Sequence, residues 1–88
     1  MEKYVGKVTH YYTRIGVAVL ELEEGLTVGD TVHICGHTTD FSQRVESMEV
    51  EHRKLQAVGA GADVALKVEE RVRSGDKIYK EIDQAPHF

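Results

Sequence analysis

Two segments of the chain repeat one pattern, a glycine-aspartate pair followed at once by an alternating apolar run. The pairs are Gly29-Asp30 and Gly75-Asp76, and residues 61–66 form a looser third copy. Glycine supplies the positive φ that a tight turn needs, and aspartate can accept hydrogen bonds from backbone amides two residues further on. The alternation that follows each pair places one apolar face inward. These features predict a chain of short strands entered through similar turns.

Alternating side chains predict strands elsewhere in the chain as well. We expect strands within residues 4–12, 17–22, 31–35, 41–50, 64–68 and 77–82. Val17 and Val19 would then point outward. The side chains that share an inward face are Ala18, Leu20 and Leu22, then Val32 and Ile34, and later Val64, Leu66 and Val68.

The segment over residues 41–58 has the least regular pattern. Val45 and Met48 fix opposite phases of the alternation, and this one-residue slip predicts a β-bulge near Ser47. A helix over residues 44–58 is the alternative, because the apolar residues there have partly helical spacing. The β-branched content and the absence of an N-cap disfavour that helix.

Short strands separated by turns about every 8–12 residues, without a convincing helix, indicate an all-β domain. A chain of 88 residues has room for one domain with a modest core. A closed barrel is favoured because closure removes exposed edge strands. We therefore predict one β-barrel domain over residues 1–82 and a loose tail over residues 83–88.

Composition limits the classes of function that the chain can serve. The net charge of -4 argues against a basic field over the whole surface, so any RNA contact would be a local patch. A single cysteine, Cys35, cannot form an internal disulfide. The chain has no long apolar run and no positively charged leader, which predicts a cytoplasmic protein without a membrane segment.

The ordered turns resemble those of the second domain of translational GTPases such as elongation factor Tu. The resemblance rests on residues 25–34, 45–48, 60–66 and 72–76. It implies a closed, six-stranded antiparallel Greek-key barrel and a free-standing elongation factor-like protein. The same barrel resembles the C-terminal domain of collagenase-like peptidases. The phosphate-binding motif G-x-x-x-x-G-K-[ST] is absent from the sequence, so no GTP binding is expected.

The resemblance also implies a candidate RNA-binding loop. In the resembled factors the barrel contacts the aminoacyl end of tRNA, and residues 13–16 lie in the corresponding loop, so Arg14 matches a basic position there. Further candidates are chosen because arginine and aromatic side chains suit phosphate pairing and base stacking. Ordinary surface charge is the alternative, because Glu46, Glu49 and Glu51 are interleaved with them. The complete candidate set for RNA or partner binding is Arg14, Arg44, Arg53, Lys54, Tyr12 and His52.

Catalytic and metal sites have little support in the sequence. His33, Cys35 and His37 share one face of an expected strand, but the rise per residue separates the first and last by about 13 Å. We therefore predict no metal site there. No nucleophile-elbow motif surrounds any serine, so we predict neither an enzyme nor a cofactor.

Outward apolar residues offer a second kind of contact. Val17, Val19 and Tyr79 could form a patch for a protein partner or for a homodimer. The sequence thus favours a non-catalytic, elongation factor-like module that binds tRNA, rRNA or a protein of the translation machinery. The alternative is a detached accessory subunit that docks on an enzyme such as a collagenase-like peptidase.

Overall fold

The computed structural model describes residues 1–82, and the tail predicted for residues 83–88 lies outside them. Residues 1–82 form strands and turns without any helix, so no helix in this part could cross a membrane. The helix considered for residues 44–58 is therefore wrong, and the all-β class is confirmed. The strands are β1 (Glu2–Tyr12), β2 (Val17–Leu22), β3 (Leu26–Thr27), β4 (Thr31–Cys35), β5 (Asp40–Arg44), β6 (Met48–Val50), β7 (Arg53–Leu55), β8 (Ala57–Val58), β9 (Asp63–Lys67) and β10 (Lys77–Glu81).

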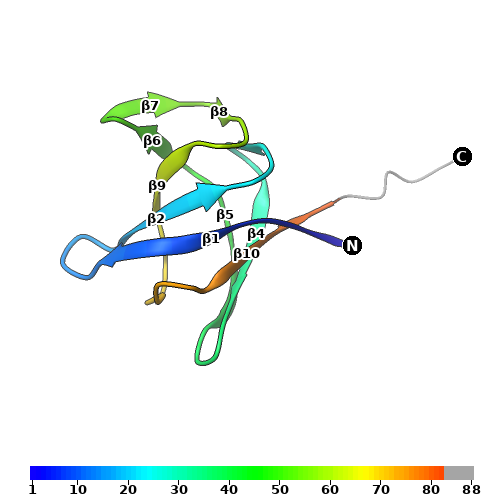
Figure 1. Cartoon of the computed structure of the whole chain (residues 1–88), viewed down its shortest axis with the longest axis vertical. Coiled ribbons are helices and arrows are strands. Elements are labelled where there is room, and N and C mark those ends of the chain that lie inside the picture. Colours follow the sequence, from blue (N-terminus) through cyan, green and yellow to red (C-terminus); the bar gives the residue numbers. More distant parts are fainter. Residues whose placement is uncertain (83–88) are drawn as a thin grey trace, which may run out of the picture.

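Eight of these strands form one antiparallel sheet in the order β5-β4-β10-β1-β2-β9-β6-β7 (Figure 1). The remaining two, β3 and β8, pair with each other. The hydrogen-bonded order ends at β5 and at β7, so the prediction of a closed six-stranded barrel was wrong in both closure and strand number. The expected strand over residues 41–50 divides into β5 and β6, and the connecting segments add the short strands β3, β7 and β8.

The core lies on the inner face of the curved sheet, and the alternation placed its members correctly. Ala18, Leu20 and Leu22 are fully or almost fully buried, while Val17 and Val19 are only partly covered. Burial of each such aliphatic side chain contributes about 1.5–3 kcal/mol to folding. The inward faces predicted for the later strands are also buried, namely Val32, Ile34, Val64, Leu66 and Val68.

The two glycine-aspartate turns have nearly identical geometry. The amide of Asp30 donates to the carbonyl of Thr27 at 3.0 Å, and Asp30 Oδ2 accepts from the amide of Thr27 at 2.9 Å. Arg73 and Asp76 make the same pair of bonds at 3.0 and 2.9 Å. The intervening glycines have φ values of 101° and 96°, which a side chain would disfavour. Each aspartate thus bonds a residue three positions earlier, not two positions later.

The phase slip between Val45 and Met48 is accommodated without the predicted bulge. Residues 45–47 leave the regular strand, and both Val45 and Met48 are buried. Val45 is held by two bonds of 2.8 Å, one from the amide of Gly29 and one to the carbonyl of Asp30. The register shifts occur in β1 instead, between Tyr4 and Gly6 and again between Val8 and His10.

Candidate functional site

Strand register decides which outward side chains meet on the face formed by β1, β2, β9 and β6. In one row across the sheet Tyr12 lies beside Val17, which lies beside Lys67. The next outward row runs from His10 to Val19, then Ala65 and Glu49. Side chains alternate between faces, so the buried row between these two faces the core. The outer face therefore carries an apolar strip with an aromatic ring at one side and a carboxylate at the other.

A strained turn borders this face. Val50 pairs with Arg53, so Glu51 and His52 form a two-residue hairpin turn. Their φ values are 51° and 67°, the left-handed conformation that such turns usually assign to asparagine and glycine. Left-handed backbone costs an ordinary residue about 1–2 kcal/mol. Strained backbone of this kind is concentrated at functional sites, which makes the turn a candidate.

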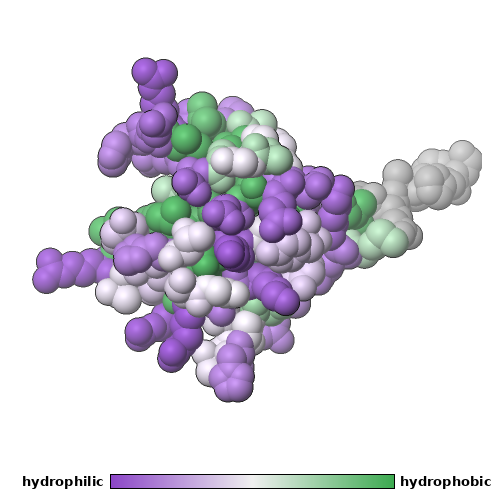
Figure 2. All heavy atoms as spheres, in the orientation of Figure 1, coloured by the Kyte–Doolittle hydropathy of each residue, from purple (hydrophilic) through white to green (hydrophobic). Residues whose placement is uncertain are grey.

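Two adjacent hollows occupy the outer face between the β1–β2 connection and the β6–β7 turn, and we call them together the outer groove. The β1–β2 connection and the β6–β7 turn project on the same side of the molecule (left in Figure 1). Apolar surface is visible in the hollow beneath the β6–β7 hairpin (Figure 2). The larger hollow, about 390 Å³, is lined by Tyr12, Ile15, Val17, Ser47, Glu49, His52, Ala65 and Lys67. The smaller, about 240 Å³, is lined by Tyr12, Val19, Glu49, Glu51, His52, Asp63 and Ala65.

The smaller hollow is acidic. Glu49, Glu51 and Asp63 all line it, and within residues 1–82 none of the three forms an ion pair. Of the two hollows, the larger is lined by Lys67 and the smaller is not. The smaller hollow therefore presents negative charge without an ion-pair partner beside apolar surface, which suits a cation that also has apolar neighbours.

The candidate residues predicted for RNA or partner binding are divided among several places. Tyr12 and His52, distant in sequence, meet in the outer groove. Arg14 lies beside it in the β1–β2 connection, where it shares a shallow depression with Tyr12. Arg53 and Lys54 are exposed on β7. Arg44 is on β5, and its Nη2 atom lies 3.7 Å from where a Cβ on Gly29 would be.

The apolar residues predicted for docking are also separated. Val17 and Val19 line the outer groove. Tyr79 is on β10, where its ring packs edge-on against Tyr4 at 5.6 Å between centroids and lies 6.4 Å from the ring of His33. Tyr4 is near the start of β1, whereas the groove contacts the end of that strand. The groove is therefore built from Val17 and Val19 without Tyr79.

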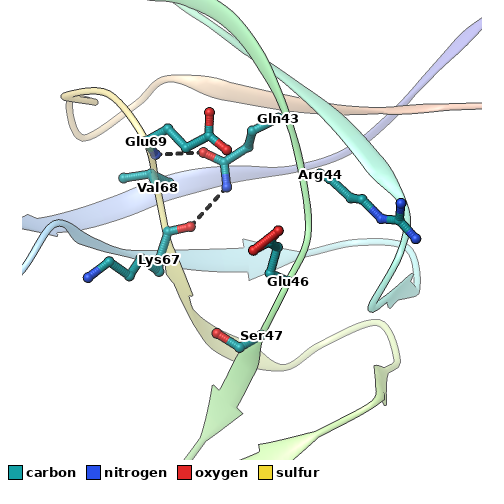
Figure 3. Close-up of a pocket in the computed structure, with 7 residues that line it drawn as sticks. All are labelled: Gln43, Arg44, Glu46, Ser47, Lys67, Val68 and Glu69. Atoms are coloured by element: carbon teal, nitrogen blue, oxygen red, sulfur yellow. Dashed lines mark hydrogen bonds between the residues drawn. The ribbon is translucent and has the colours of Figure 1, made fainter.

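Gln43 was not singled out from the sequence, and it makes the most informative polar contacts of the structure. Its amide nitrogen donates to the carbonyl of Lys67 at 2.9 Å, and its amide oxygen accepts from the amide of Glu69 at 2.7 Å (Figure 3). Arg44, the next residue, points away from these contacts (Figure 3). The signal was present, because Gln43 has the same phase of the alternation as buried Val45. A polar residue at a core-facing strand position needs hydrogen-bond partners.

Both ring nitrogens of His33 contact carboxylates. Its Nδ1 lies 2.9 Å from Glu2 Oε2, and its Nε2 lies 2.5 Å from Asp40 Oδ1. The hydrogen bond to Asp40, followed by that to Glu2, raises the pKa of His33 above its usual value. Burial raises the pKa of the Cys35 thiol, so its reactive thiolate is disfavoured. Within residues 1–82, no group of three or more His, Cys, Asp or Glu residues is placed to hold a metal ion.

Comparisons with known proteins extend these observations. No protein-family model matches the chain. The chain is 36% identical over 76 residues to an uncharacterized protease of Methanocaldococcus jannaschii, covering 85% of this chain and 19% of the protease. It is 39% identical over 79 residues to a collagenase of Porphyromonas gingivalis, covering 88% of this chain and 22% of the collagenase. The chain thus spans about a fifth of the length of the curated relatives it matches.

Solved structures that resemble this chain also come from a peptidase. The C-terminal domain of a U32 peptidase of Geobacillus thermoleovorans superposes with a TM-score of 0.85 and 24% identity, covering 91% of this chain and 93% of that domain. The selenomethionine variant of the same domain superposes with a TM-score of 0.82 and 23% identity, covering 86% of this chain and 96% of that domain.

The prediction of a translation-factor domain was wrong, because the relatives are a protease and collagenases and the structural neighbours are peptidase domains. RNA binding of the translation-factor kind loses its basis with it. The sequence resemblance to the C-terminal domain of collagenase-like peptidases is supported. The chain has the fold of a U32 peptidase C-terminal domain and is similar in sequence to part of proteins named collagenase and protease.

Proposed function

We propose that the chain is a non-catalytic accessory domain that serves a collagenase-like peptidase of the U32 type. The observation that carries this proposal is the superposition on a U32 peptidase C-terminal domain, which extends over 91% of this chain and 93% of that domain. A likeness over the whole of both domains is what two versions of the same module would give.

The chain matches only a small part of each relative, which supports separate roles for the matched domain and for the remainder of the protein. The aligned segment is 22% of the collagenase and 19% of the protease. In this proposal the remainder of such a protein supplies the catalytic groups, and the β domain supplies a binding surface. The outer groove is the surface of this chain best suited to such a role, because it combines apolar area with uncompensated charge.

A domain exchange in the Porphyromonas gingivalis collagenase tests the proposal. The matched segment of 79 residues is deleted in one variant and replaced by this chain in another. We expect the deletion to weaken gelatin hydrolysis, the replacement to restore it at least in part, and an unrelated small β domain to restore nothing. Circular dichroism on each variant establishes that it is folded.

The chain by itself is the second arm of that experiment. Incubated with gelatin, it should release no peptides, because catalysis belongs to the rest of the peptidase. Hydrolysis by the purified chain, retained in the presence of inhibitors of contaminating proteases, would contradict the accessory role. So would a folded replacement variant no more active than the deletion.

A further inference from the structure

The two hollows of the outer groove share one wall but differ in character. The shared wall consists of Tyr12, Glu49, His52 and Ala65. Beyond it, the smaller hollow adds Val19 and the carboxylates of Glu51 and Asp63. The larger hollow adds the aliphatic side chains of Ile15 and Val17, together with Ser47 and Lys67 at its border. An acidic site and an apolar site therefore lie directly side by side.

The smaller hollow has the chemistry of a site for a cationic side chain. Carboxylates accept hydrogen bonds from a guanidinium or ammonium group, and such charge-assisted bonds are stronger than neutral ones. The ring of Tyr12 adds a surface on which a cation can lie. No cation of the described residues neutralises Glu49, Glu51 or Asp63 by an ion pair, so the site's charge is available to a ligand.

The larger hollow has the chemistry of a site for an aliphatic or aromatic side chain. Ile15 is 59% exposed and Tyr12 is 49% exposed, so both side chains leave apolar surface open to water. Val17 and Ala65 form the floor between them. An apolar group placed here would remove this surface from water.

We propose that the outer groove binds an extended peptide segment with a basic side chain and an apolar side chain two residues apart. In an extended chain, residues i and i+2 point to the same side, about 6.6 Å apart, so neighbouring hollows can take both. This inference concerns the ligand of the groove and does not require that the chain serve a peptidase.

Other occupants fit less well. A nucleic acid would bring phosphates towards Glu49, Glu51 and Asp63, and like charges repel. A second copy of this chain facing the groove across a two-fold axis would bring the same three carboxylates together. A peptide with one basic and one apolar side chain complements both the carboxylates and the apolar surface of the groove.

Fluorescence anisotropy with short synthetic peptides tests the proposal. Each labelled peptide carries arginine and leucine two residues apart in a glycine-serine background, one in each order. We expect at least one of the two arginine-leucine peptides to bind with a Kd of roughly 100 μM, because a shallow groove buries little of a short peptide. A matched peptide with glutamate in place of arginine should bind at least tenfold more weakly, and so should one with serine in place of leucine.

Charge-neutral variants link the binding to the groove. The double variant Glu49→Gln with Asp63→Asn should weaken binding of the arginine peptide about tenfold. Glu70→Gln, which removes an exposed carboxylate outside both hollows, is the matched control and should leave it unchanged. Failure of both arginine peptides to bind, equal binding of the glutamate peptide, or no effect of the double variant would each overturn the proposal.

Sedimentation velocity decides the remaining alternative. The chain should be monomeric at the concentrations of the binding assay. A dimer that dissociates on Val17→Glu substitution would show that the groove is occupied by a second copy, and the peptide proposal would be overturned.

Discussion

The side-chain amide of Gln43 donates a hydrogen bond of 2.9 Å to the backbone carbonyl of Lys67, and thereby joins β5 to the end of β9. The two strands are not neighbours in the hydrogen-bonded order, in which β4, β10, β1 and β2 lie between them. The same amide accepts a bond from the amide of Glu69. One buried side chain thus substitutes for strand pairing along a seam that the backbone leaves open.

Substitution Gln43→Leu should destabilise the domain by about 2 kcal/mol. Leucine fills a similar volume, but the carbonyl of Lys67 and the amide of Glu69 would lose their partners, and unsatisfied buried groups are costly. Urea unfolding followed by circular dichroism measures the change. Ser42→Ala, at the adjacent exposed position of β5, is the control and should change stability by less than about 0.5 kcal/mol. A Leu variant as stable as the control would show that the seam does not need Gln43.

Substitution Gly6→Ala should strongly destabilise the domain. A Cβ at residue 6 would overlap the backbone carbonyl oxygen of Glu21, because β1 and β2 approach closely there. Since backbone must move, we expect a loss of about 2–3 kcal/mol. Gly59→Ala is the matched control, because no atom lies within 4 Å of its added Cβ. Thermal unfolding of both variants distinguishes this steric effect from a general preference for glycine.

The contacts of His33 with Glu2 and Asp40 should make stability depend on pH. These carboxylates raise the folded-state pKa of His33 above its ordinary value of 6.5, so protonation favours the folded state. Their contribution is fully present below the unfolded-state pKa and is lost as pH rises through the raised folded-state pKa. The other ionisable ring that faces His33 is that of Tyr79, on β10.

Unfolding free energies at about pH 5.5 and about pH 8.5 check this dependence. His33→Gln should reduce stability at the lower pH more than at the higher pH. His37→Gln, at an exposed position of the β4–β5 connection, should leave the pH profile of the wild type unchanged. An equal loss at both pH values in the His33 variant would indicate a role for the ring that is independent of its charge.

The strained β6–β7 turn should show a conflict between stability and binding. Replacing Glu51 by asparagine and His52 by glycine supplies residues that adopt positive φ readily, so the free energy of unfolding should rise by about 1 kcal/mol. Both replaced side chains line the acidic hollow, so binding of the arginine peptide should weaken in the same variant. Glu51→Gln separates the two effects, because it keeps the strain and removes only the charge. If the double variant binds the peptide as well as the wild type, the turn serves folding alone.

Local patterns revealed much of this fold and only pieces of its site. Alternation identified the inward face of β2 at Ala18, Leu20 and Leu22, because side-chain direction in a strand depends only on neighbouring residues. It misled at residues 45–47, where a slip in phase indicated a bulge and the chain instead leaves the strand. Tyr12 and His52 both belong to the candidate set that the sequence predicts for RNA or partner binding, but the sequence did not place them beside carboxylates. The carboxylates that change the character of their surroundings come from β6, β9 and the turn between β6 and β7.

The sequence by itself determined the all-β class, the glycine-aspartate turns and the composition of the core, since each depends on short-range geometry and on burial of apolar side chains. Only the tertiary structure decided that the sheet stays open between β5 and β7, that Gln43 bridges β5 and β9, and that Tyr12 meets Glu49, His52 and Asp63 in one groove. These features depend on the register between strands that are distant in the chain. A shift of one residue in that register would turn the groove side chains towards the core.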